Sequence, residues 1–401
     1  MSLRHISQVT SDDVDQLILD QVPESRVLDY KQELPDRGAD GTREFLADVS
    51  SFANAGGGEI LFGVSEQRDA DGKSNGLPES VVGLGSANLD AEVLRLDNQL
   101  RDGIDPRIQG VRFQIVDGFS QGKCLLMRIP QSWVSPHMVC FRNSSRFHVR
   151  TNTGKHQLDV SEIRSAFLGS EKLADQLKAF RDDRVGKILS GNGLIRETSS
   201  TVLVFHLIPI NSFADRTSLD ISSLATEHRD LGVHKDGTRS HLINFDGLVA
   251  YTYHNNRDNP VDYTQLFRNG AIETVEADMS SLDPDGKYWV SSKEVENSLR
   301  ANLHRNLTFF DKHGIDPPFF GSITLFGVQG KTLATHQDDP HQRDQCDPFD
   351  RDIIVFPEFQ IADTAKSIDQ ILRPVFDLLW QAAGKISCPH FDKSGNWISP
   401  P

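Results

Sequence analysis

The sequence predicts an α+β protein with two domains, and three observations support this. Residues 24–66 have the pattern of a strand, a helix and a second strand, residues 111–151 add short strands, and a new alternation of apolar strands and helices begins after residue 193. A chain of 401 residues is long enough to form two or three separate cores. The expected divisions are an N-terminal arm over 1–19, a first domain over 20–170, a helix and linker over 171–198, and a second, mixed α/β domain over 199–401.

The stretch between Gly41 and Asn54 predicts a helix with one apolar face. Its apolar residues recur at helical spacing, at Phe45, Leu46, Val49, Phe52 and Ala53. Asn54 and the glycines at 56–58 tolerate the left-handed conformation of a helix end, so the helix should end there. Glycines at a helix C-terminus face the negative end of the dipole, which favours a tight turn over a phosphate-binding loop. The apolar run at 60–64 then reads as a buried strand.

The remaining elements follow from the same periodicities. In the first domain we expect a helix over 88–100, a hairpin of strands over 111–116 and 123–129, a second hairpin over 139–151, and a helix over 159–167. Beyond it we expect a helix over 171–189, strands over 202–210, 247–253, 263–267, 322–328 and 353–356, and helices over 292–313 and 363–383.

Composition places the chain among ordinary globular proteins. It is 37% apolar and 25% charged, with no apolar run of 18 residues and no secretory signal at its acidic start, so we expect a cytoplasmic protein. Its four cysteines are widely spaced, which predicts free thiols instead of a disulfide framework or a paired-cysteine zinc site. Cys388-Pro389-His390 lacks a partner at nucleophile-base spacing and is expected to be structural.

The net charge of −15 disfavours a general binder of polyanions, but one region is an exception. Residues 101–155 contain nine basic and three acidic residues, a local charge of +6. Within them, aromatic residues alternate with arginines over 141–150. This pattern is compatible with a solvated face, but it also predicts a hairpin that holds phosphates. The candidate nucleic-acid-binding residues are Arg142, Arg146, Arg150 and Lys155.

Charged residues at the start and end of the strand-helix-strand unit form a candidate metal site. Alternation along a strand puts Asp29 and Lys31 on one face, with Glu24 just before them and Glu66 just past the later strand. Carboxylates that converge repel one another unless a cation lies among them, and hard oxygen ligands suit Mg²⁺ or Mn²⁺. Such an ion could activate water against a phosphodiester, with Lys31 stabilising the developing charge. Alternatively, Asp29 and Lys31 form a surface ion pair worth less than about 1 kcal/mol.

Several motifs together resemble the Schlafen-type AlbA-like domain. They are Glu24-Ser25-x-x-x-Asp29-x-Lys31, then Ser51-Phe52-Ala53-Asn54 with Gly57-Gly58 and Ile60-Leu61-Phe62-Gly63-Val64, and later Pro136-His137 and Phe147-His148-Val149-Arg150-Thr151-Asn152-Thr153-Gly154. The resemblance covers about residues 20–170. It implies a Schlafen/AlbA-like fold for the first domain, and nucleic acid as its partner.

In nuclease-active Schlafen proteins three carboxylates bind the metal that cleaves tRNA and related RNA. Carried over by position, these are Glu24, Asp29 and Glu66, although Asp29 replaces a longer glutamate and Glu66 a shorter aspartate. The resemblance therefore implies an Mg²⁺- or Mn²⁺-dependent endoribonuclease, and bacterial relatives suggest a role in anti-phage defence. Two alternatives remain open: a non-catalytic DNA- or RNA-binding regulatory protein, and a protein-interaction module. One chain supplies only one matched lobe of an RNA-binding groove, so two protomers could form the groove together as a homodimer.

Overall fold

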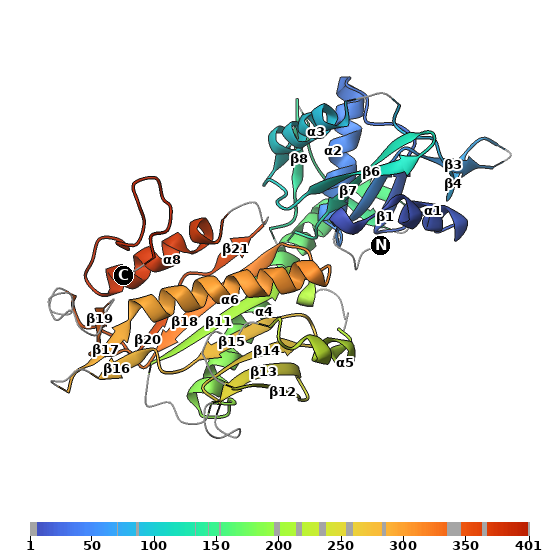
Figure 1. Cartoon of the computed structure of the whole chain (residues 1–401). Helices are drawn as coiled ribbons and strands as arrows, with labels where there is room; N and C mark the ends of the chain where they lie inside the picture. The colour runs from blue at the N-terminus through green and yellow to red at the C-terminus, as the bar shows by residue number, and fades with distance from the viewer. Residues whose placement is uncertain are drawn as a thin grey trace. The chain divides into compact units, whose positions relative to one another are not determined.

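The computed structural model consists of two compact units (Figure 1). It describes residues 6–69, 71–85, 88–132, 134–142, 144–151, 154–195, 201–213, 219–231, 238–253, 260–282, 286–334, 346–362 and 367–399. The first unit holds residues 1–175 and 311–318, and the second holds 176–310 and 319–401. No helix in these described ranges combines the length and the apolar character that crossing a bilayer requires.

Helix α4 (Val160–Leu189) is continuous and crosses the division between the two units. The sequence pattern had predicted two helices with an interruption near residue 170. Gly169 nevertheless lies inside α4, because an isolated glycine costs a helix only about 1 kcal/mol. Burial of Leu173 and Leu177 on the next turns favours continuing the helix.

A four-stranded sheet in the order β1-β2-β7-β6 forms the centre of the first unit. Its strands are β1 (Leu28–Lys31), β2 (Gly58–Phe62), β6 (Arg112–Phe119) and β7 (Gly122–Ile129). β1 and β2 are parallel and are connected by helix α2 (Ala39–Ala53), whereas β6 and β7 form an antiparallel hairpin. The predicted strand-helix-strand unit and the first predicted hairpin are therefore confirmed.

Helices cover both faces of this sheet. On one face, Phe52 of α2 and Leu96 of α3 (Leu89–Gly103) join a core with Leu125 of β7. On the other face, Val14 of α1 (Ser11–Leu19) packs in a core with Tyr30 of β1. Leu28 and Tyr30 point to the α1 side of the sheet. Because side chains alternate along a strand, Asp29 and Lys31 point to the α2 side.

Two smaller sheets complete the first unit. One has the order β10-β9-β8-β5, with β5 (Ile104–Asp105), β8 (Met138–Phe141), β9 (Ser144–Thr151) and β10 (Gly154–Gln157), and the other pairs β3 (Val64–Arg68) with β4 (Ser74–Val81). The second predicted hairpin is thus β8–β9. Asn54, which follows α2, donates to the carbonyl oxygens of His137 and His148 at 2.9 Å each, so it fixes the end of α2 to this hairpin.

The second unit is built on an eight-stranded antiparallel sheet. Its strands are β11 (Val202–Pro209), β12 (Thr238–Ile243), β13 (Gly247–Tyr253), β14 (Asp262–Phe267), β15 (Ile272–Glu276), β18 (Phe319–Phe326), β20 (Ile353–Val355) and β21 (Phe359–Ile361). Side chains of α6 (Ser292–Lys312) bond to Glu276, and Arg184 of α4 bonds to Glu273. Since 273 and 276 point to opposite faces of β15, the two helices lie on opposite sides of the sheet.

The remaining elements of both units are short, apart from one helix. They are α5 (Ile221–Leu224), α8 (Ile368–Ala382), the 3-10 turns Ile6–Gln8, Ile210–Phe213 and Ala225–Glu227, and a small sheet of β16 (Ser280–Leu282), β17 (Tyr288–Ser291) and β19 (Thr332–Ala334). Ser367 is the N-cap of helix α8 and forms a capping box with Gln370. The α+β class and the second mixed domain agree with the sequence analysis.

Candidate carboxylate site and basic hairpin

Strand β1 brings Asp29 and Lys31 together on the side of the sheet that faces α2. Lys31 Nζ lies 2.8 Å from Asp29 Oδ2, so the predicted shared face is present. Asp29 is only 2% exposed, whereas the Lys31 side chain is 37% exposed. This pair is therefore not the surface ion pair considered as the alternative, because its carboxylate is buried.

Arg150 of β9 is a second cation on Asp29. Its Nη2 donates to Asp29 Oδ1 at 2.7 Å, and its Nε donates to the Ser25 carbonyl oxygen at 3.1 Å. The guanidinium also lies 4.5 Å from the ring centroid of Phe52. Arg150 is 6% exposed and its guanidinium is bonded to a buried carboxylate, so in this structure it is not accessible to the phosphate that it was predicted to anchor. There its guanidinium neutralises the buried carboxylate of Asp29.

Glu24 lies in the loop before β1, and its carboxyl group interacts with that of Asp29. Its Oε1 accepts the backbone N–H of Tyr30 at 2.9 Å. Burial, then the hydrogen bond and the negative charge of Asp29, raise the pKa of Glu24 to about 8. Burial alone would raise the pKa of Asp29 too, but the bond from Glu24 and the charges of Lys31 and Arg150 lower it. The proton of this carboxyl pair therefore resides on Glu24.

Glu66 occupies a different local position from the expected one. It lies within β3 and not past the end of a strand, because Gly63, at φ +98°, turns the chain directly from β2 into β3. The Ser74 hydroxyl of β4 donates to Glu66 Oε2. Burial raises the pKa of Glu66, Lys31 opposes this, and the charge of Asp29 adds to it. Glu66 thus belongs to the same electrostatic group as Asp29 and Lys31.

The three predicted metal ligands do not close tightly around one point. Among the residues that the structure describes, three ligand-type atoms come within 4.8 Å of one another at one place, formed by Glu296, Cys388 and His390. Glu24 and Asp29 share a hydrogen bond, whereas Glu66 acts on Asp29 through its charge. The predicted convergence of Glu24, Asp29 and Glu66 is accordingly partial.

Asp48 is a member of this group that sequence reasoning missed. It lies on α2 at 7% exposure, and its charge raises the pKa of Lys31. Lys155 Nζ lies 2.7 Å from Asp48 Oδ1 and 2.6 Å from Glu44 Oε1. Lys155 was predicted to bind phosphate, but its ammonium is already held by two carboxylates. The signal in the sequence was the spacing of Glu44 and Asp48, four residues apart and so on one helix face.

The two other predicted phosphate anchors are exposed. Arg142 sits at the turn between β8 and β9 with φ +53°, and its guanidinium lies 5.6 Å from the ring centroid of Phe141. Arg146 of β9 is exposed and donates to Gln157 of β10. Unlike Arg150, both arginines face solvent, where they are accessible to a polyanion.

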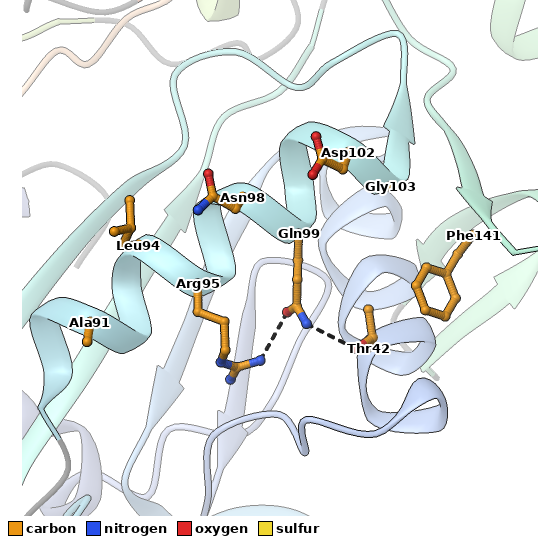
Figure 2. Close-up of a pocket in the computed structure, with 9 residues that line it drawn as sticks. All are labelled: Thr42, Ala91, Leu94, Arg95, Asn98, Gln99, Asp102, Gly103 and Phe141. Carbon is orange, nitrogen blue, oxygen red and sulfur yellow. Dashed lines mark hydrogen bonds between the residues drawn. The ribbon is translucent and has the colours of Figure 1, made fainter.

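Two cavities lie beside the basic hairpin within the first unit. The first, of about 560 Å³, is lined by α2, α3 and Phe141 (Figure 2). In it, Gln99 of α3 accepts from Arg95 at 3.2 Å and donates to Thr42 of α2 at 3.0 Å. The second, of about 540 Å³, lies between Arg150 and the first turns of α4. The lining of neither cavity includes Glu24, Asp29 or Glu66.

The raised pKa of Glu24 predicts that the free energy of unfolding falls as the pH rises. The ordinary pKa of a glutamate is 4.5 and that of Glu24 in the folded chain is about 8, so its contribution is full below 4.5 and lost as the pH passes 8. Because Glu24 is partly exposed, solvent screening reduces the effect to about 1–2 kcal/mol between pH 5 and pH 9. The free energy of unfolding in urea should therefore change less between these two pH values in Glu24→Gln than in the wild type. The exposed control Glu33→Gln should match the wild type, and a wild-type difference in Glu24→Gln would contradict the assignment.

The first unit thus combines an α+β fold, buried acids on the edge strand β1 and a basic hairpin. Residues 24–159 match the family model described as Schlafen, AlbA_2. The chain therefore carries a Schlafen/AlbA-like domain in its N-terminal part, which supports nucleic-acid binding as the general class of activity.

A search of solved structures gave a similarity to the N-terminal domain of a RecG-related protein from Nitrosomonas europaea, determined in solution. The identity is 22%, the match covers 30% of this chain and 72% of that chain, and the TM-score is 0.23. A search of curated proteins found no match.

Proposed function

We propose that this chain is a metal-dependent endoribonuclease of the Schlafen type that acts on tRNA or another structured RNA. The observation that carries the proposal is the crowding of carboxyl groups beside β1. Burial and Asp29 raise the pKa of Glu24 to about 8, and burial raises the pKa of Glu66 as well. A divalent cation would relieve this crowding by replacing the proton between Glu24 and Asp29.

The donor set fits a hard cation. Glu24, Asp29 and Glu66 offer only carboxylate oxygens, which suit Mg²⁺ or Mn²⁺. Asp29 Oδ2 is buried and has Lys31 Nζ as its ion-pair partner at 2.8 Å. A bound ion would supply polarisation of the phosphodiester and an activated water. Around it, Arg150 holds Asp29 in place, and Lys31 is positioned to stabilise negative charge that develops on the phosphate.

RNA would reach this site over the exposed face of the β8–β9 hairpin. Arg142 and Arg146 are its solvent-facing cations, and they lie within the region of positive local charge in an otherwise acidic chain. Arg142 adjoins Phe141, and an aromatic ring next to an arginine offers both stacking and charge to an unpaired base. An anti-phage role and a homodimeric RNA groove are parts of the proposal that rest on the family resemblance alone.

The test is a cleavage assay on the full chain with tRNA and Mn²⁺. We expect wild-type cleavage that chelation abolishes, and a loss of rate of about 100-fold or more in Asp29→Asn and in Glu24→Gln, the size seen when a group that stabilises the transition state is removed. Glu33→Gln, an exposed acid just after β1, should cleave at the wild-type rate. Circular dichroism must confirm that each variant is folded. Wild-type rates in folded Asp29→Asn would remove Asp29 from the mechanism.

A non-catalytic nucleic-acid-binding regulator is the second candidate, and one observation favours it. Both oxygens of Asp29 face cations, Lys31 and Arg150, so the carboxylate is neutralised without a metal. Fluorescence anisotropy on the same samples separates the two functions. RNA binding that weakens in Arg142→Glu and Arg146→Glu, with no cleavage by any sample, would favour the regulator. The absence of RNA binding in every sample would favour the third alternative, a protein-interaction module.

A further inference from the structure

The second unit contains a cluster of metal-ligand side chains that plays no part in the proposed nuclease site. Glu296 lies on α6, whereas Cys388 and His390 lie in the segment that follows α8. Their ligand-type atoms all lie within 4.8 Å of one another, and all three residues are buried, at 0%, 5% and 7% exposure. Glu296 precedes Cys388 by 92 residues and His390 by 94, so their proximity is not visible in the sequence pattern.

The Glu296 carboxylate is the centre of this cluster. His390 Nδ1 lies 2.7 Å from Oε2, and the Cys388 thiol donates to Oε1 across 3.4 Å. The indole N–H of Trp380 on α8 also donates to Oε1, at 2.8 Å. The rings of Trp380 and Trp397 lie edge-on to the His390 imidazole, with centroids 5.5 and 5.7 Å away. An oxygen, a sulfur and a nitrogen donor thus share one space walled by aromatic rings.

Among the residues that the structure describes, the cationic partner given for the Glu296 carboxylate is a histidine. The carboxylate is fully buried, and the ion-pair partner that the structure gives it is His390. A buried carboxylate is costly unless a positive charge balances it. A carboxylate and a thiolate together carry two negative charges, which one divalent cation would neutralise.

We propose that Glu296, Cys388 and His390 form a zinc site that fastens the C-terminal segment to α6. A mixed sulfur, nitrogen and oxygen donor set suits zinc, whereas Mg²⁺ and Ca²⁺ select oxygen donors. Binding breaks the S–H bond of Cys388, forms a zinc–sulfur bond and releases the proton to solvent. Asp377 of α8 lies next to this group, since its Oδ1 accepts the Cys388 backbone N–H at 2.9 Å, and it is the candidate for a fourth ligand.

The local structure explains what such an ion would contribute. Between α8 and residue 399 the described chain forms one isolated bridge, Phe391 with Trp397, and a turn at Asp392. Regular backbone pairing therefore holds this segment at few places. A zinc ion would join the segment to α6 through Glu296, and metal ligation contributes directly to folding in segments with little regular structure.

The experiment measures zinc in the full chain, purified without a metal-affinity tag and loaded with zinc before extensive dialysis. We expect about one zinc ion per wild-type chain and less than about a tenth of that in Cys388→Ser and His390→Gln. Cys346→Ser, a buried cysteine of the same unit, and His304→Gln, an exposed histidine of α6, are the matched controls and should keep the ion. Asp29→Asn should keep it too, so this result does not depend on the proposed nuclease site.

Two measurements on the wild type keep the proposal testable if the variants do not fold. Cobalt substitution should give the near-ultraviolet charge-transfer band of a cobalt–thiolate bond, which a purely hydrogen-bonded cluster cannot produce. Chelation should lower the melting temperature, and zinc but not magnesium should restore it. A folded wild type that retains no zinc, gives no thiolate band with cobalt and melts at the same temperature with chelator would establish a hydrogen-bonded cluster and overturn the proposal.

Discussion

Arg150→Ala is expected to lower the free energy of unfolding of the first unit by about 3–5 kcal/mol, as breaking a buried ion pair does. The substitution leaves Asp29, at 2% exposure, with Lys31 as its remaining cation. It also removes the bond to the Ser25 carbonyl and the packing of the guanidinium on Phe52. Urea denaturation followed by circular dichroism measures the loss.

Arg146→Ala is the matched control for this experiment. Arg146 lies on the same strand and the same face as Arg150, four residues away, but it is exposed. Its loss should change stability by no more than about 0.5 kcal/mol. If Arg150→Ala were equally mild and weakened RNA binding instead, Arg150 would return to the role of phosphate anchor. A large loss of stability with normal RNA binding by the folded fraction would establish it as a structural partner of Asp29.

Glu273→Gln is expected to destabilise the second unit by a similar amount, about 3–5 kcal/mol. Glu273 is fully buried and accepts two bonds from Arg184, at 2.9 and 2.8 Å. Tyr263 donates to it at 3.0 Å, and His206 Nε2 lies 3.1 Å away. Burial alone would raise the pKa of Glu273, but Arg184 and His206 lower it to about 2. An amide at this position would leave the Arg184 guanidinium with the exposed carboxylate of Asp246, 3.9 Å away, as its remaining counter-charge.

The pH dependence provides a second measurement of the same network. A lowered pKa means that Glu273 contributes stability above its ordinary pKa of 4.5, and that this contribution is lost as the pH falls towards 2. Glu273→Gln should therefore lose less stability than the wild type when the pH falls from 6 to about 3. The exposed Glu294→Gln on α6 should follow the wild type at both pH values. Equal acid sensitivity in wild type and Glu273→Gln would contradict the assigned pKa.

Sequence reasoning worked where the determining interactions are local. The apolar spacing of Phe45, Val49 and Phe52 predicted α2 and its end before Asn54, because helix periodicity acts over a few residues. Asn54 itself has φ −79°, and the left-handed conformation falls on Gly57, at φ +74°. Alternation along β1 likewise placed Asp29 and Lys31 on one face. The strands of the second unit that consist of apolar residues, such as β11 and β18, were predicted for the same reason.

One strand that carries two buried acids was missed. Strand β15 (Ile272–Glu276) carries Glu273 and Glu276, and the pattern Ile-Glu-Thr-Val-Glu does not read as a buried strand. Both glutamates are nevertheless fully buried, because Arg184 and the side chains of α6 supply their partners. Periodicity cannot reveal such a strand, since the partner of Glu273 lies 89 residues away.

The charge pairs of the candidate site could not be predicted for the same reason. The types of residue in it could be chosen from the sequence, whereas the pairing could not: Arg150 meets Asp29 across 121 residues and Lys155 meets Asp48 across 107. From sequence alone both cations looked available to a phosphate, and only the folded chain assigns them to carboxylates. The raised pKa of Glu24 depends on burial, which a sequence does not state.

The amino-acid sequence by itself determined the strand-helix-strand unit, the two hairpins of the first domain and the family of that domain, because backbone periodicity and local motifs carry this information. The tertiary structure alone decided which charges are buried, which cations of the basic hairpin face solvent, and that Glu296 lies beside Cys388 and His390. Charge pairing and desolvation depend on distances in space between residues far apart along the chain, and these distances are set only when the chain folds.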